Sequence, residues 1–183
     1  YSGIPASFLE QDRLQNLINY VNEHKTNPNA KIAWHLTWAY QEDSTHNNFR
    51  LYNSSQEEMF AAIIDTVQSE IAGHEDIDII IPSGTAIQNV RTSYIGDTLT
   101  RDGYHLSLNL GRYIAGLAWI PALTGLPIDD ITWVPNVREV PEHYLPLIKE
   151  AVNAAIENPF SVTKSSFVEK PQLEGVEVSS EDK

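Results

Sequence analysis

The residues best placed to do chemistry are Asp102 and His105, three positions apart in the polar stretch 100–107. Gly103 lies between them and allows a tight turn, so both side chains can project to one side just before an apolar helix. In a Ser-His-Asp triad the histidine accepts the proton of the nucleophile, and the carboxylate orients the imidazole. Asp102 and His105 would supply two of these three groups. The spacing alone favours a simpler alternative, in which Asp102 makes a turn hydrogen bond and His105 caps the next helix.

Three residues at the end of a predicted strand are candidate substrate contacts. Trp38, Tyr40 and Gln41 follow an apolar stretch, and α/β sheets bind their ligands beyond the carboxyl ends of the strands. The indole of Trp38 would offer a flat face to a sugar ring. Packing of Trp38 into the core is an equal alternative.

Other polar residues have simpler interpretations. Asp43 and His46 belong to a polar stretch and could reach the site, although a solvated loop is favoured. His35 lies among apolar residues, which favours a core histidine with satisfied hydrogen bonds over a ligand. Asp97 and Arg101 are expected to pair locally or to hold the loop that carries Asp102, with a substrate contact as the minor alternative.

The pattern of apolar residues predicts an α-β-α-β-α-α order, which is typical of an α/β layered domain. The predicted elements are helices over 7–24, 55–73, a short stretch after Pro82, 107–123 and 141–157, and strands over 31–40 and 77–81. Both strands are apolar on both faces, which favours a parallel sheet covered by helices. Two strands are too few for a stable sheet, so we expect further strands upstream of Tyr1.

The chain therefore divides into two parts. Residues 1–160 are assigned to the C-terminal portion of one α/β domain. Residues 161–183, where Ser, Glu and Lys become frequent and periodicity is lost, are assigned to a tail or linker.

Composition narrows the possible partners. The 25 acidic and 12 basic residues give a formal net charge of −13, which disfavours nucleic acid and anionic membranes as partners. The absence of cysteine excludes disulfides, thiolate metal sites and a cysteine nucleophile. No apolar run approaches the roughly 20 residues that span a bilayer. The chain starts at Tyr1 without the features of a signal peptide, so any such peptide is expected to lie outside it.

Four blocks of sequence resemble the SGNH (GDSL) hydrolases, and specifically a bacterial branch with a domain-of-unknown-function label. The blocks are WHLTWAYQEDS (34–44), IPSGTAIQN (81–89), GDTLTRDGYH (96–105) and GRY (111–113). They occur in the expected order, and the resemblance covers about Ser2 to Phe160. It implies a three-layer α/β/α, flavodoxin-like fold with a parallel sheet, of which this chain is the C-terminal part. It also implies that His105 is the general base and Asp102 its orienting carboxylate.

The function implied by the resemblance is serine ester hydrolysis without metal or organic cofactor, with a small-molecule or carbohydrate ester as substrate. Deacetylation of a carbohydrate is the expected reaction. The Gly-Asp-Ser-like block that carries the family's nucleophile does not occur here, so we expect the serine on an upstream segment of the same domain. Ser83 and Ser2 are poor substitutes. The resemblance also implies an extracytoplasmic location in a bacterium, whether periplasmic, surface-bound or secreted.

Two other functions stay open. The first is a non-catalytic glycan-binding or structural domain that keeps the SGNH scaffold without the serine. The second is a metal site built from Asp102, His105, His35 or His46, which ranks last because no third ligand stands at a fixed spacing.

Overall fold

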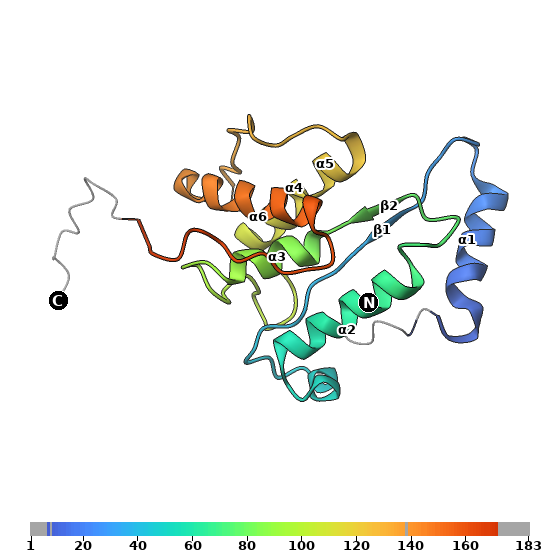
Figure 1. The fold of residues 1–183 in the computed structure, drawn as a ribbon, viewed down its shortest axis with the longest axis horizontal. Helices are drawn as coiled ribbons and strands as arrows, with labels where there is room; N and C mark the ends of the chain where they lie inside the picture. The colour runs from blue at the N-terminus through green and yellow to red at the C-terminus, as the bar shows by residue number, and fades with distance from the viewer. Residues whose placement is uncertain (1–6, 8, 138, 172–183) are drawn as a thin grey trace.

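The chain folds around two short parallel strands with helices on both sides (Figure 1). The computed structural model describes residues 7, 9–137 and 139–171. Its helices and strands are α1 (Arg13–His24), β1 (Ala33–His35), α2 (Gln56–Glu70), β2 (Ile79–Ile81), α3 (Ser83–Arg91), α4 (Leu110–Leu117), α5 (Trp119–Thr124) and α6 (Leu145–Glu157). Three 3₁₀ turns complete the order, η2 (Glu10–Asp12), η3 (Asn47–Tyr52) and η4 (Glu142–Tyr144). The expected α/β class with parallel strands is confirmed.

Two apolar clusters form the core, one on each side of the strands. The first joins α3, α4 and α6 to Ile81 of β2, and the second joins α2 and Ile18 of α1 to Leu36, just after β1. In Figure 1 the strands accordingly run between α1 and α2 on one side and α3, α4 and α6 on the other. Burial of these apolar side chains is the main force that holds the helices to the strands.

The first strand is shorter than the sequence predicts. Pairing covers three positions, with Ala33 opposite Ile79 and His35 opposite Ile81. The amide of Leu36 still donates to the Ile81 carbonyl over 3.0 Å. The next carbonyl, that of Leu36, accepts the amide of Gly84 over 2.9 Å, so the ladder ends where α3 begins at Ser83. The expected full burial is also wrong for β1, since Ala33 is exposed.

The helix boundaries confirm some signals and correct others. The Ser55 hydroxyl accepts from the Glu58 amide at the start of α2, and Gly125, at φ 69°, ends α5. The stretch predicted as one helix over 107–123 is two helices that meet at Ala118, because Pro121 cannot donate to the preceding turn. The capping box predicted at Ser7 is wrong: residues 11 and 12 take left-handed backbone angles, so α1 begins only at Arg13.

The segment after α6 is bound to the domain as far as Phe167. Its hydrogen bonds reach α3, α6 and the turn after α3, and link Thr163 N to Asn89 Oδ1 (2.7 Å), Ser165 N to Thr92 Oγ1 (2.8 Å), Ser165 Oγ to Glu150 Oε1 (2.7 Å) and Tyr94 N to Phe167 O (2.9 Å). This part of the stretch assigned to a tail or linker therefore packs against the helices. Residues 172–183 lie outside the described part of the chain.

Two glycines should respond in opposite ways to replacement by alanine. A Cβ on Gly84 would lie 1.8 Å from the Thr37 carbonyl oxygen, whereas a Cβ on Gly116 would meet no atom within 4 Å. We expect Gly84→Ala to lower the free energy of unfolding by about 1–3 kcal/mol. Gly116→Ala, within α4, should raise it by about 0.5–1 kcal/mol. Urea unfolding measures both, and equal stability of Gly84→Ala and the wild type would contradict the close approach.

Candidate functional site

Asp102 and His105 lie on a short hairpin between α3 and α4. An antiparallel bridge pairs Thr100 with Leu106, and the amide of Arg101 donates to the His105 carbonyl over 2.9 Å. Gly103 lies in the turn of the hairpin at φ 87°, a left-handed conformation that strongly favours glycine. The tight turn expected at this position is confirmed.

The two side chains form a hydrogen-bonded pair. His105 Nδ1 lies 2.8 Å from Asp102 Oδ2, while Asp102 Oδ1 accepts the amides of His105 (2.8 Å) and Tyr104 (3.3 Å). Asp102 therefore makes the turn bonds and orients the ring as well. The helix-capping alternative for His105 is wrong, because α4 begins after Asn109. About half of the His105 side chain, 54%, is exposed.

The hydrogen bonds to Asp102 keep its carboxylate ionised. Partial desolvation raises its pKa, but the bonds from the His105 ring and from the amides of His105 and Tyr104 outweigh that effect. The pKa falls from 3.8 to about 2. With Nδ1 engaged by a carboxylate, Nε2 is the ring nitrogen that can take up a proton.

The segment after β1 holds the hairpin in place. The indole of Trp38 donates to the Tyr104 carbonyl over 2.9 Å, and the amide of Gln41 donates to the Gly103 carbonyl over 2.8 Å. The Gln41 side chain also accepts from the Thr100 hydroxyl. Trp38 and Gln41 thus contact the hairpin directly; their role as substrate contacts stays a prediction.

A row of aromatic rings runs beside the pair. The Tyr104 ring centroid lies 4.2 Å from that of His105 and 4.8 Å from that of His46, and His46 lies 4.7 Å from Tyr40. Tyr40 is only 5% exposed, so its ring supports this row from the interior. His46 Nδ1 accepts the Asn48 amide over 3.2 Å, so His46 is packed rather than freely solvated.

A buried arginine that the sequence interpretation missed fixes the same segment from its other side. Both terminal nitrogens of Arg91 donate to the Ala39 carbonyl over 3.1 Å, and its Nε lies 2.8 Å from Asp97 Oδ1. The Arg91 side chain is 3% exposed. Burial lowers its pKa, and the carboxylates of Asp97 and Glu42 oppose that shift.

The second carboxylate oxygen of Asp97 binds the same segment. It accepts the Glu42 amide and the side-chain amide of Gln56, both over 2.8 Å. Gln56 also donates to the Tyr40 carbonyl over 3.0 Å. Asp97 pairs with Arg91 and not with Arg101, whose Nε lies 3.7 Å from Asp102 Oδ2. The available sequence signal for Arg91 was a charged residue that directly follows the apolar positions 87 and 90 at the end of a helix.

Ser83 and His35 contact parts of the fold other than the Asp102–His105 pair. Ser83 is fully buried and its hydroxyl donates to the Ala115 carbonyl over 2.9 Å, while Ser2 lies outside the described residues. The His35 ring packs 5.1 Å from that of Trp119, and burial lowers its pKa. Its Nε2 has no hydrogen-bond partner within the described chain, so the expected satisfied histidine is only half correct.

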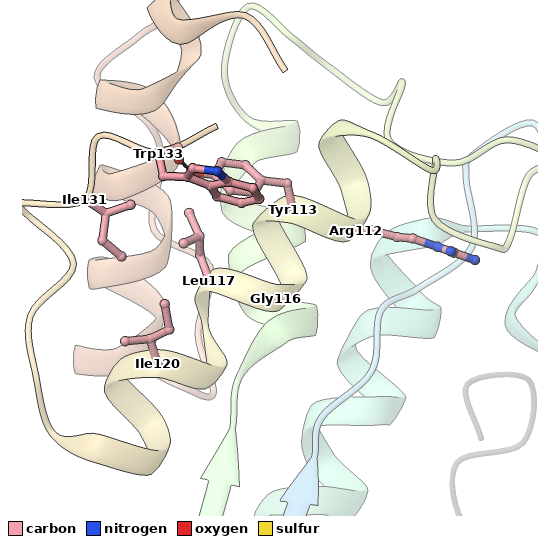
Figure 2. A pocket seen from close by; sticks show the side chains of 7 residues that line it. All are labelled: Arg112, Tyr113, Gly116, Leu117, Ile120, Ile131 and Trp133. Atoms are coloured by element: carbon pink, nitrogen blue, oxygen red, sulfur yellow. Dashed lines mark hydrogen bonds between the residues drawn. The ribbon is translucent and has the colours of Figure 1, made fainter. Parts of the chain in front are cut away.

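The Asp102–His105 pair lies outside the apolar cavity beside α4. This largely apolar cavity has a volume of about 440 Å³, and its lining includes Tyr113, Leu117, Trp133 and Arg112 (Figure 2). Neither Asp102 nor His105 lines it.

Within residues 7, 9–137 and 139–171, no three His, Asp or Glu side chains converge in a way that could hold a metal ion. No helix in the same residues has the length and apolar character needed to cross a membrane.

We expect the Asp102 carboxyl to titrate near pH 2 in the folded chain. Because its pKa is lower in the folded state than in the unfolded one, the stabilisation it contributes is complete above about pH 4 and lost as the pH falls towards 2. Carbon-13 NMR of the carboxyl group measures this midpoint. In His105→Ala the midpoint should move up towards 3.8, since the ring hydrogen bond is gone. A wild-type midpoint near 4 that the variant leaves unchanged would contradict the hydrogen-bonded pair.

Comparison with known proteins gives a family and one solved relative. Residues 1–155 match a family model described as a domain of unknown function, DUF4886. The crystal structure of a DUF4886 family protein from Bacteroides uniformis is 38% identical, with a TM-score of 0.76 over 89% of this chain. The chain spans 61% of the length of that relative. No curated protein matches the chain. The chain belongs to the DUF4886 family.

Proposed function

We propose that the chain carries the acid and base of a serine ester hydrolase of the SGNH type. The observation that supports this most directly is the 2.8 Å contact between His105 Nδ1 and Asp102 Oδ2. A carboxylate on Nδ1 fixes the ring tautomer and leaves Nε2 free to accept a proton. The low pKa of Asp102 keeps that carboxylate charged under all ordinary conditions.

The nucleophile is proposed to come from an upstream part of the same domain. Within the described residues no serine hydroxyl is hydrogen-bonded to the His105 ring, and the relative of known structure is longer than this chain. The half-exposed His105 side chain leaves room for such a residue. In this proposal the strands β1 and β2 belong to a wider parallel sheet with helices on both faces, the three-layer SGNH arrangement.

The proposed reaction has two steps. The serine oxygen attacks the ester carbonyl carbon while His105 Nε2 takes the hydroxyl proton, and backbone amides stabilise the oxyanion. The tetrahedral intermediate expels the alcohol, which takes the proton from the imidazolium. Water then attacks the acyl-enzyme with His105 again as base, releasing the acid and the free serine.

A carbohydrate ester is the proposed substrate class. The support is the aromatic surface next to the pair, in which the half-buried Tyr104 ring lies 4.2 Å from that of His105. Aromatic rings offer flat apolar faces of the kind a sugar ring packs against. The net charge of −13 is compatible with a neutral sugar ester rather than a polyanion. An extracytoplasmic location belongs to the same proposal.

The test is hydrolysis of p-nitrophenyl acetate and of an acetylated sugar by the longest natural polypeptide that contains this chain. We expect His105→Ala to lower kcat/KM by about 10³-fold or more, as is found when the base of a triad is removed. His143→Ala is the matched control, because His143 lies on η4, outside the hairpin that carries His105, and should leave the rate unchanged.

Equal rates in the wild type and in folded His105→Ala would overturn the hydrolase. Binding of the acetylated sugar without turnover would then favour the glycan-binding scaffold.

A further inference from the structure

We propose that Arg91 is a positioning residue for the Asp102–His105 pair and acts through the main chain of residues 39–42. The two ends of this connection lie on different elements, since Arg91 ends α3 and His105 lies on the hairpin before α4. A catalytic role for the positioned pair rests on the proposed hydrolase. The fixing of the hairpin by Arg91 does not depend on that function.

The first step links Arg91 to the segment after β1. Its guanidinium donates twice to the Ala39 carbonyl, and through Asp97 it is joined to the amide of Glu42. Gln56 binds the carbonyl between them, that of Tyr40. Three successive points of an irregular backbone are thus bound by side chains from α3, α2 and the loop after α3.

The second step links this segment to the hairpin. The amide of Gln41 donates to the Gly103 carbonyl, and the side chain of Trp38 donates to the Tyr104 carbonyl. Gly103 and Tyr104 are the two residues between Asp102 and His105. A shift of the segment that Arg91 holds would therefore move the backbone that sets the geometry of the pair.

Only arginine has the donor geometry that this position uses. Its planar group directs two converging N–H bonds at the Ala39 carbonyl oxygen and presents Nε to Asp97, whereas lysine offers one compact ammonium. The network is largely buried, so a lost donor leaves the Ala39 carbonyl or the Asp97 carboxylate without its partner. Three residues of the sequence blocks that resemble the SGNH hydrolases have no part in the proposed triad but belong to this network. They are Glu42, Gln88 and Asp97.

The test measures hydrogen–deuterium exchange at the amides of Gln41, Tyr104 and His105 in Arg91→Lys. These amides donate to Gly103 and Asp102, so their exchange reports on the hairpin directly. We expect exchange at all three to rise by about tenfold or more, through local opening. Arg112→Lys is the exposed control, because Arg112 lies on α4 (Figure 2) and makes none of the hydrogen bonds described above, so exchange at the three amides should not change.

A second control separates positioning from general destabilisation. Ile148→Val removes one buried methyl group from α6 and lowers stability without touching the network. If Arg91→Lys raises exchange at these amides no more than Ile148→Val does, the proposal is wrong. Asp97→Asn should raise exchange at the same amides as Arg91→Lys does, and it replaces Arg91→Lys in the test if that variant does not fold.

Activity gives an independent arm in the longest natural polypeptide. If ester hydrolysis is present, Arg91→Lys should lower kcat by about tenfold with KM little changed, because the pair is misplaced while substrate contacts remain. A rise in KM alone would contradict a positioning role. If the wild type has no esterase activity, the hydrolase proposal fails, while the exchange measurement still decides whether Arg91 fixes the hairpin.

Discussion

The architecture of the site depends on one buried contact, the guanidinium of Arg91 between the Ala39 carbonyl and the Asp97 carboxylate. Among the described residues, the segment 37–41 after β1 belongs to no strand, and its polar backbone would be costly to leave unpaired in the interior. Side chains supply hydrogen-bond partners to part of this segment. The irregular segment thereby becomes rigid enough to hold the hairpin that carries Asp102 and His105.

Local signals predicted the parts of the fold that are local in origin. Ser55 and Gly125 mark a helix start and a helix end, and Gly103 marks the turn between Asp102 and His105, because each acts within a few residues of itself. The pairing of Asp102 with His105 was implied by the family resemblance, whereas their spacing alone favoured a turn bond and a helix cap.

Longer connections could not be predicted in this way. Arg91 binds Ala39 across 52 positions, and Gln56 binds Asp97 across 41, so neither partner is visible from spacing. The expected length of β1 was wrong for a related reason, since the pairing ends where the segment after β2 turns into α3 at Ser83 and not where the apolar residues after β1 end. The ring of Trp38 packs against the core, as one of its two interpretations expected, and its N–H donates to the hairpin. Its role as a substrate contact stays a prediction.

The bond from the Trp38 indole to the Tyr104 carbonyl gives the protein an intrinsic spectroscopic reporter. An indole N–H resonance is resolved from the backbone signals, and its chemical shift depends on the hydrogen bond that it donates. Movement of the hairpin on ligand binding would change that resonance without any label. The chain has four tryptophans, and substitution of Trp38 by phenylalanine would assign the signal.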